Sequence, residues 1–600
     1  MRPGAARPAR GRRAGAAAPR AGPPGAAGGR AQKASNMKTA AVTAGFAGTA
    51  AVQGSFVNAM IMNETAAEAV GGASIAGGSL TVRAADTSAI DSLGGTASAS
   101  GTVSIGAALL HNLIKNTTRA TLRDYGVQVA GTAAVEALSD AEINNLALAA
   151  AFAGNVAVAG GLSSSEIVNE TAAEAQAAPG VRLEAGELAV EARDRSELFT
   201  SSGELGAAGT VTAGGALANN VVANRTAARL DGFTLDVDGA LSVLAGNVSR
   251  IRTTAASAGA AGAAAVKGSV ASAHIHNETE AFMGGGWSVN GDSRATVQAD
   301  DRASITTIAG AGAVGGTAGV GGTVAVNTIG NRTAAGVRGS AGESGYQLGN
   351  LVVRSDSGAE IAGVAAAAAG GAFAGVAGSV ATNVIDNETE AFIDGGALVT
   401  AQNNAGVIAE SHDVITNATG TLGIGIKGAG VGASVTVNMI GGHTKAFIAG
   451  SDTKVTALGQ GDGLEGLAAG GIGQVNLADT LDVDFENGVE DFDRPRLAEL
   501  LQRETVRGVA VNAAATHSIL NVVGTAGAGL VGIAGTAGVN VLRGSTEAYV
   551  DGASLNTSAA DAAGQSVSVR AVDHAYNHAF VGTVSAGGGA LGAGVNAATF

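Results

Sequence analysis

Histidine side chains are the groups in this chain that could bind a metal ion or move a proton near neutral pH. Among eight histidines, His274 and His276 would share one face of a strand, and His574 and His578 lie four residues apart. A zinc site needs further ligands at a matching spacing, and neither pair has one nearby. The chain has no cysteine, which excludes disulfides and thiolate-bound metals. We therefore expect no metal and no cofactor.

Carboxylates could supply general acids and bases, but the sequence shows no cluster of them. Asp482, Asp484 and Glu486 resemble part of a calcium loop, yet Gly488 comes one position too late for the EF-hand pattern. We interpret this stretch as a solvated acidic loop. No nucleophile elbow, Walker loop or H-E-x-x-H motif occurs, and the G-x-G strings lack a βαβ context. The sequence thus predicts neither an enzyme nor a small-molecule substrate.

An Asn/Gly-x-Thr tripeptide recurs along the chain. The Thr residues are spaced by 53 to 56 positions, apart from a last interval of 102. Ala follows two positions after every Thr, and an apolar residue stands four positions before it. Even offsets share one face of a strand, whereas a helix would scatter them. The repeated Thr residues are Thr65, Thr118, Thr171, Thr226, Thr279, Thr333, Thr389, Thr444 and Thr546.

Asparagine occupies two positions of this repeat. The Asn two positions before the Thr forms a glycosylation sequon. In the last two repeats it is replaced by Gly442 and Gly544, and a second Asn, six positions before the Thr, lies outside the sequon. Stacked amides that bond to one another and to the backbone explain both positions. We favour this structural interpretation over glycosylation.

The pattern predicts an all-β protein, a parallel β-solenoid (β-helix) built from about nine repeats of about 54 residues. Gly/Ala-rich stretches such as 309–327 disfavour helix and suit a narrow core. A rung of about 18 residues would give three rungs per repeat. Strands stacked at about 4.8 Å would then form a rod on the order of 130 Å long.

Four segments follow from composition. Residues 1–38 hold nine Lys+Arg, no acid and five of the seven prolines, and they lack the apolar region of a secretory signal. We predict a disordered leader there. Residues 39–455 and 506–600 are predicted solenoid, with the array cut off within a repeat. Residues 456–505 are predicted to be an acidic insertion that projects from the solenoid.

A short helix is expected inside the insertion. Leu497, Leu500 and Leu501 follow helical spacing, Pro495 suits a first helical turn, and Glu499 precedes Arg503 by four residues. From Thr39 onward, 26 basic residues stand against 50 acidic ones. This negative charge argues against nucleic acid as a partner.

Aromatic residues gather at one register position, three residues after the anchor Thr, which should face outward. They are Phe282, Phe392, Phe447 and Tyr549, out of 3% aromatic residues in the whole chain. An outward aromatic stripe is typical of a partner-binding surface. The alternative is packing against a flanking segment that covers this face.

Long uncharged runs raise the question of a membrane. Residues 303–331, 361–385 and 508–542 are long enough to span one. They are rich in Gly and Ala, poor in Leu and Phe, and in register with the repeat. We therefore interpret them as a buried face of the solenoid.

The repeat can be written V-x-V-N-x-I-x-N-x-T-x-A-x-I-x-G, with near copies at 324–339 and 435–450. With this motif, residues 40–600 resemble large secreted bacterial adhesins, in particular leukotoxin-type filamentous adhesins of the filamentous-haemagglutinin-like and autotransporter-passenger group. The resemblance implies a secreted protein at the bacterial cell surface or outer membrane, an outer-membrane secretion partner, and adhesion to host or neighbouring cells in virulence. The alternative function is that of a membrane-active, leukotoxin-like toxin.

Overall fold

The computed structural model describes residues 26–72, 74–178, 180–285, 294–339, 346–472, 501–557 and 565–600. Every regular element in these ranges is a β-strand. Neighbouring strands of the main sheet pair in parallel and mostly in register, with shifts between Val129 and Thr132 and between Gly425 and Ala429. The prediction of an all-β, parallel solenoid is confirmed.

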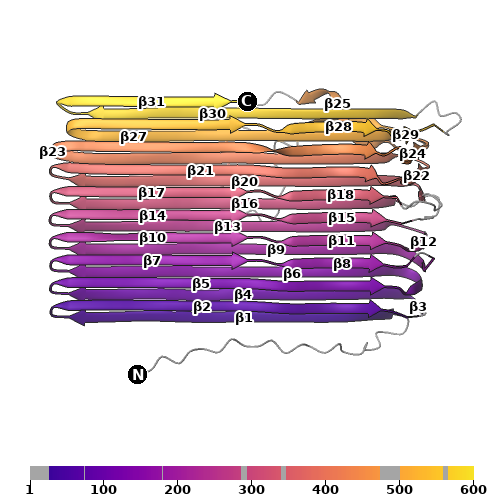
Figure 1. The fold of residues 1–600 in the computed structure, drawn as a ribbon, viewed down its shortest axis with the longest axis horizontal. Coiled ribbons are helices and arrows are strands. Elements are labelled where there is room, and N and C mark those ends of the chain that lie inside the picture. Colours follow the sequence, from indigo (N-terminus) through magenta and orange to yellow (C-terminus); the bar gives the residue numbers. More distant parts are fainter. Residues whose placement is uncertain are drawn as a thin grey trace.

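Each turn of the solenoid, or coil, contains two long strands and a short third side (Figure 1). The chain runs along a first sheet, reverses in a tight turn, returns along a second sheet and crosses a short third face. Ala26 pairs with Ser79 on the first sheet, and Ala50 pairs with Val103 on the second. One whole repeat therefore makes one coil. The prediction of three rungs of about 18 residues per repeat is wrong.

The first sheet contains β1 Ala26–Ala47, β4 Ser79–Ser100, β6 Gly126–Ala153, β9 Arg182–Ala208, β13 Leu241–Ala261, β16 Arg294–Gly315, β20 Asn350–Gly371, the first halves of β23 Ala405–Ala449 and β27 Gly508–Leu542, and β30 Ser566–Ala586. The second sheet contains β2 Ala50–Val70, β5 Val103–Arg123, β7 Val156–Ile167, β8 Glu170–Gln176, β10 Val211–Val222, β11 Arg225–Asp231, β14 Ala264–Ile275, β15 Glu278–Gly284, β17 Ala318–Ile329, β18 Arg332–Arg338, β21 Ala374–Asp394, the second halves of β23 and β27, β28 Ser545–Asp551 and β31 Gly589–Thr599.

The third face is built from short strands and the first residues of β6 and β9. The short strands are β3 Ser74–Gly77, β12 Thr234–Val237, β19 Tyr346–Leu348, β22 Leu398–Ala401, β24 Lys454–Ala457 and β29 Ser554–Leu555. It separates the two sheets at one end of the long strands.

The molecule is a slab rather than a rod. A strand of 22 residues, such as β4, is about 70 Å long at about 3.3 Å per residue. About ten coils at about 4.8 Å stack to a height on the order of 45 Å. The longest axis accordingly follows the strands (Figure 1), so the expected rod on the order of 130 Å is also wrong.

Side chains alternate between the core and the surface along most strands, whereas the first residues of β23 and β27 are buried on both faces. On β2, Ile61, Thr65 and Ala67 are buried, while the residues between them face outward. This confirms the assignment of the even offsets to one buried strand face. The same register recurs in each coil, because every coil is one repeat.

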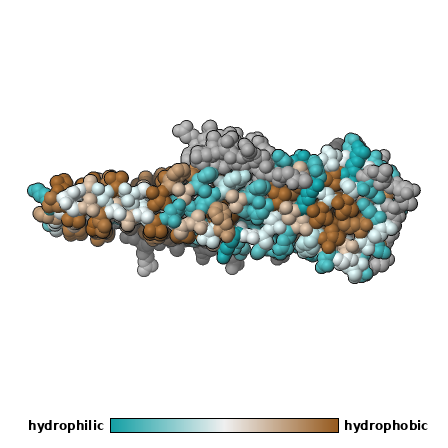
Figure 2. Space-filling view, turned by 90° about the horizontal axis from the view of Figure 1, so that it is seen from above, coloured by the Kyte–Doolittle hydropathy of each residue, from teal (hydrophilic) through white to brown (hydrophobic). Residues whose placement is uncertain are grey.

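The core narrows from the third face towards the tight turns. Near the third face it is filled by Leu, Val and Phe233. A continuous ladder of Ile and related residues follows, from Ile61 and Ile90 to Leu542. Beyond it the apolar residues that meet between the sheets are mainly alanines, joined by Val57 and Leu110 in the first coils. The described part of the molecule therefore tapers, as the view along the stack shows (Figure 2). We call the tapered part, from the Ile ladder to the turns, the thin lobe.

Glycine permits the closest approach in the thin lobe. A Cβ on Gly375 of the second sheet would lie 2.2 Å from the carbonyl oxygen of Ile424 on the first. At the turns, a Cβ on Gly154 would lie 2.1 Å from the carbonyl oxygen of Gly101 in the neighbouring coil. Backbone thus packs on backbone here, and no larger side chain fits.

The predicted leader is too long. Strand β1 begins at Ala26, so residues 26–38 belong to the solenoid, where Lys38 Nζ lies 3.0 Å from a carboxylate oxygen of Asp91. In-register pairing with β4 is what orders this basic stretch. Residues 1–25 lie outside the described residues.

The insertion contains an antiparallel strand pair, β25 Leu464–Ile472 and β26 Leu501–Val506. The helix expected around Pro495 falls mostly outside the described residues, which resume at Leu501. Leu501 and Arg503 lie in a strand, because pairing with β25 overrides the local helical spacing. Among the described residues, no helix is long and apolar enough to cross a membrane.

The close approach of the two sheets predicts that alanine substitutions at two glycines have different effects on the free energy of unfolding. We expect Gly375→Ala to destabilise the fold by about 1–3 kcal/mol, because the new methyl group meets backbone that cannot move aside. Gly322→Ala is the control, since a Cβ there meets nothing within 4 Å and should be neutral or slightly stabilising. Denaturant unfolding curves measure both effects. Equal stability of the two variants would contradict backbone contact in the thin lobe.

Candidate functional site

Two buried polar layers flank the Ile ladder. On the thin-lobe side, Asn residues form an amide ladder. Nδ2 of Asn327 donates to Oδ1 of Asn383 at 2.8 Å, Asn383 to Asn438 at 2.8 Å, and Asn438 to Asn540 at 2.9 Å. Each of these residues is fully buried. These are the Asn residues six positions before the anchor Thr, so their structural interpretation is confirmed.

The sequon Asn residues form the layer on the other side. The backbone N–H of Asn63 donates to Oδ1 of Asn116 at 3.2 Å, and the contact recurs in following coils as far as Asn387. Nδ2 of Asn116 donates at 2.9 Å to both Asp86 and Ser88 on the opposite sheet. These amides are buried and engaged, so the folded chain offers none of them for glycosylation.

Carboxylates lie opposite the anchor Thr residues in the same layer. The Thr279 hydroxyl donates to Asp301 Oδ2 at 2.8 Å, and Asn331 Nδ2 donates to Asp301 Oδ1 at 2.6 Å. Burial raises the pKa of Asp301 to about 7 and the pKa of Asp194 to about 6, and hydrogen bonds from neighbouring side chains offset only part of this effect. The pKa values of these two carboxyls are thus shifted, and both carboxyls are buried in the core between the sheets.

The predicted aromatic residues do come together, on the outer face of the second sheet. The ring centroids of Phe282 and Phe392 lie 5.9 Å apart, those of Phe392 and Phe447 5.4 Å apart, and those of Phe447 and Tyr549 5.1 Å apart. Phe282 and Phe392 are two coils apart, with Gly336 between them. A Cβ on Gly336 would lie 2.4 Å from the Phe392 ring, so glycine makes room for this contact.

The aromatic rings of Phe392, Phe447 and Tyr549 lie face to face. Phe392 and Phe447 are inclined by 11°, Phe447 and Tyr549 by 3°, and the Arg338 guanidinium lies 5.0 Å from the centre of the Phe392 ring. Phe392 is only 2% exposed. The stack thus stabilises the outer face through aromatic and cation–π contacts and presents mainly ring edges. Partner binding by these four residues stays a prediction.

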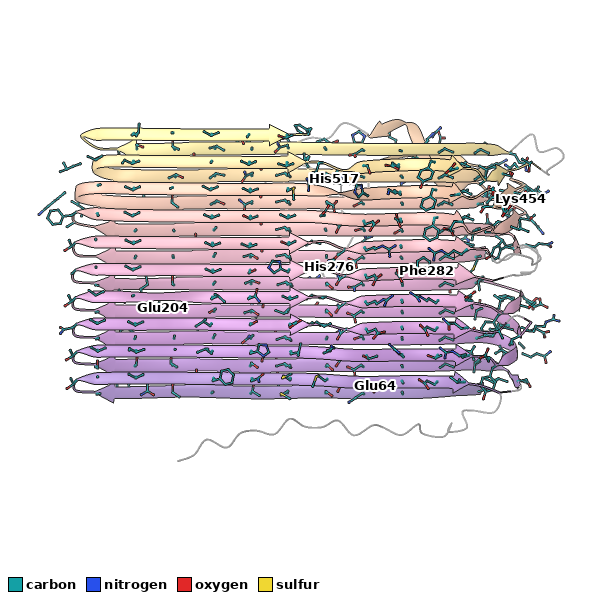
Figure 3. All side chains as sticks on the ribbon, in the orientation of Figure 1. Glu64, Glu204, His276, Phe282, Lys454 and His517 are labelled. Atoms are coloured by element: carbon teal, nitrogen blue, oxygen red, sulfur yellow. The ribbon has the colours of Figure 1, made fainter. Side chains whose placement is uncertain are left out.

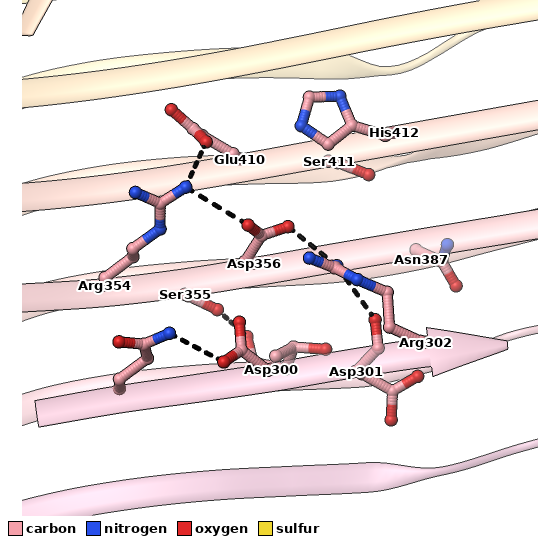
Figure 4. A network of polar contacts seen from close by, with 12 residues as sticks. Asp300, Asp301, Arg302, Arg354, Ser355, Asp356, Asn387, Glu410, Ser411 and His412 are labelled. Atoms are coloured by element: carbon pink, nitrogen blue, oxygen red, sulfur yellow. Dashed lines mark hydrogen bonds and ion pairs between the residues drawn. The ribbon is translucent and has the colours of Figure 1, made fainter. Parts of the chain in front are cut away.

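A cluster of ionisable residues that the sequence did not reveal lies on the outer face of the first sheet (Figure 4). Asp300, Asp356 and Glu410 occupy one column in successive coils. Arg302 donates to Asp356 at 2.8 Å, and Arg354 donates to Asp356 at 3.2 Å and to Glu410 at 2.6 Å. The expectation that the sequence holds no cluster of carboxylates is therefore wrong. Their spacing follows the repeat period, which was the signal that could have found them.

Burial and charge pull the pKa values in this cluster in opposite directions. Burial opposes ionisation of Asp356, but the guanidiniums of Arg302 and Arg354 hold the pKa of its carboxyl well below the usual range. Burial likewise opposes ionisation of Glu410, while Arg354 and Arg503 bring its net pKa below the ordinary value. Burial lowers the pKa of His412, whose Nδ1 lies 2.7 Å from the Thr516 hydroxyl. Asp356 and Glu410 are thus ionised and His412 is neutral near pH 7.

The insertion covers this cluster. Arg503 of β26 lies 2.8 Å from Glu410 Oε1, and Leu467 and Leu501 of the strand pair pack on Ala514. Asp356, Glu410 and His412 are buried beneath. The cluster anchors the insertion to the solenoid, and it offers no open surface for chemistry in this structure.

The histidine pairs do not assemble ligand sets. His274 Nε2 contacts the Ser272 hydroxyl at 2.8 Å, and no group of three His, Asp or Glu side chains among the described residues is placed to hold a metal ion. Figure 3 shows His276 on the second sheet and His517 several coils away from it.

These features define the class of the protein, a parallel β-solenoid with buried asparagine ladders. Comparison of the chain with protein-family models, with curated proteins and with solved structures finds no match. The fold class therefore follows from the coils themselves.

The buried Asp301 predicts that stability falls as pH rises. Its pKa is about 7 in the folded chain against 3.8 ordinarily, so its contribution is complete below about pH 4 and is lost as pH rises to 7. We expect Asp301→Asn to remove up to about 4 kcal/mol of this pH dependence. Asn247 in the neighbouring coil already occupies the same column, so an amide fits.

Thermal unfolding of the wild type and Asp301→Asn between pH 4 and pH 8 measures this effect. The exposed Asp452→Asn serves as control and should keep the wild-type slope. A wild-type melting temperature that rises over this pH range would contradict the prediction.

Proposed function

We propose that this chain belongs to a secreted adhesin at a bacterial cell surface, in which the solenoid is both scaffold and binding surface. The observation that carries this proposal is a groove of about 860 Å³ on the second sheet. It follows the breaks between β7 and β8, β10 and β11, β14 and β15, and β17 and β18. It therefore runs across the coils and suits an extended chain on a host or neighbouring cell.

One wall of the groove is a column of alternating charges. Glu170, Arg225, Glu278, Arg332 and Glu388 succeed one another in adjacent coils. Arg225 Nε lies 3.2 Å from Glu278 and Arg332 Nε lies 3.5 Å from Glu388. These arginines are 50% and 39% exposed, so they are free to exchange partners with a ligand. Such a wall can bind hydroxyl and carboxylate groups of a surface glycan or peptide.

The double variant Arg225→Ser, Arg332→Ser tests adhesion through the groove. We expect binding of the labelled chain to cultured epithelial cells to weaken about tenfold or more, because charge-assisted contacts are lost. Arg332 also lies 2.8 Å from the buried Glu280, but Arg229 stays paired with this carboxylate at 2.8 Å, so the fold should be retained, which circular dichroism verifies. The control Arg123→Ser, Arg182→Ser removes the same charge away from the groove. Equal binding by both double variants, or no binding by the wild type, would refute the proposal.

Membrane activity is the second candidate, because both outer faces of the thin lobe carry exposed apolar side chains. A membrane-active toxin would release dye from liposomes at low protein concentration. Gly322→Ala, on the outer face of the lobe, should release dye like the wild type, because it adds no charge. Liposomes that retain their dye in the presence of the wild type would refute the toxin function.

A further inference from the structure

The thin lobe is almost free of charge. Its segments are 92–112, 145–165, 200–220, 253–273, 307–327, 363–383, 417–438 and 521–540, and they contain only Glu204, Lys267 and Lys427 as charged residues. Lys267 Nζ lies 2.5 Å from Glu204 Oε1, and both side chains are fully buried. Figure 3 shows Glu204 in the half of the strands that ends at the tight turns. The only charge that this lobe presents to its surroundings is Lys427.

Both outer faces of the lobe carry aliphatic side chains. On the first sheet Leu205 is 49% exposed, and on the second sheet Val266 is 47% exposed. Each belongs to columns of Val, Leu, Ile, Ala and Gly that continue through neighbouring coils. The narrow end in Figure 2 is accordingly apolar on both sides. A soluble surface rarely shows so large an apolar area without a partner.

The tight turns at the end of the thin lobe, which we call the tip, also expose apolar side chains in three neighbouring coils. Turns are normally built from Gly, Asn, Asp, Ser and Pro. Here Phe373, Ile426 and Leu530 stand at successive turns and are 59%, 73% and 59% exposed. Lys427 lies beside them, and its backbone N–H donates to Ala372 O at 2.6 Å. Nothing in the packing of the coils requires these exposed side chains.

The backbone of these coils is already satisfied. Residues of the lobe pair in parallel with the coils on both sides, as Ala374–Ile385 do with Ala318–Ile329 and with Ala429–Ile440. A lipid environment rejects unpaired backbone groups and accepts apolar side chains on paired backbone. A second copy of the chain would cover one face, whereas lipid covers both faces and the tip together.

We propose that the thin lobe docks tip-first on a lipid bilayer with anionic headgroups. Phe373, Ile426 and Leu530 enter the acyl layer, and Lys427 extends back to the lipid phosphates. The thick part, which carries the groove, stays in water. This inference does not rest on adhesion through the groove, and the two are tested by different residues.

Flotation of the full chain with liposomes of phosphatidylcholine and phosphatidylserine tests the proposal. We expect the wild type to float and the triple variant Phe373→Ser, Ile426→Ser, Leu530→Ser to lose about tenfold or more of its affinity, since three apolar side chains no longer enter lipid. The matched control is Val70→Ser, Leu398→Ser, Val567→Ser, which removes three exposed apolar residues from the thick part. It should float like the wild type. Circular dichroism verifies that each variant keeps the β-fold.

The variant Lys427→Ser tests the contact with anionic headgroups separately. It should weaken flotation with anionic vesicles and leave flotation with pure phosphatidylcholine unchanged. A wild type that does not float, or a tip variant that floats like the control variant, would overturn the proposal. So would sedimentation without lipid that shows a dimer abolished by the tip substitutions, because a second copy would then occupy this surface.

Discussion

Parallel, in-register pairing of each coil with the next is the constraint on which the rest of this structure depends. Because the register does not slip along most of the stack, a residue type that recurs at one position of the repeat becomes a continuous column. Columns of asparagine then bond amide to amide, and columns of isoleucine bury their side chains against one another. Buried polar groups are costly unless they are paired, and here partners come from the neighbouring coil, as for Asn383, or from the opposite sheet, as for Asn116.

The taper of the molecule follows from side-chain volume within these columns. Large aliphatic residues hold the sheets apart near the third face, alanine brings them together, and glycine allows carbonyl groups to pack where a Cβ would stand. This gradient divides the chain into a thick part, which holds the groove, the aromatic stack and the ion cluster, and a thin lobe almost without charge. Binding of a polar chain and contact with lipid are thus proposed for opposite ends of the same strands.

Most of the fold class was predictable from the sequence, since even offsets around the anchor Thr identify a buried strand face. The length of a coil was not. Glycine recurs at the first position of the two-residue turns at the tip, for example Gly48, Gly101 and Gly154, but it does not stand out in a chain with 95 glycines. The boundary of the leader was missed for another reason, because residues 26–38 form a strand only through pairing with β4.

The sequence by itself determined the strand faces, the repeat register and the structural role of the asparagines, because these depend on spacing within one repeat. Only the tertiary structure decided which repeats meet. It brought Asp300, Asp356 and Glu410 together beneath Arg503 of the insertion, and it set Glu204 against Lys267. It also decided that the described residues leave both faces of the thin lobe uncovered, since exposure depends on what packs against a strand and not on the strand alone.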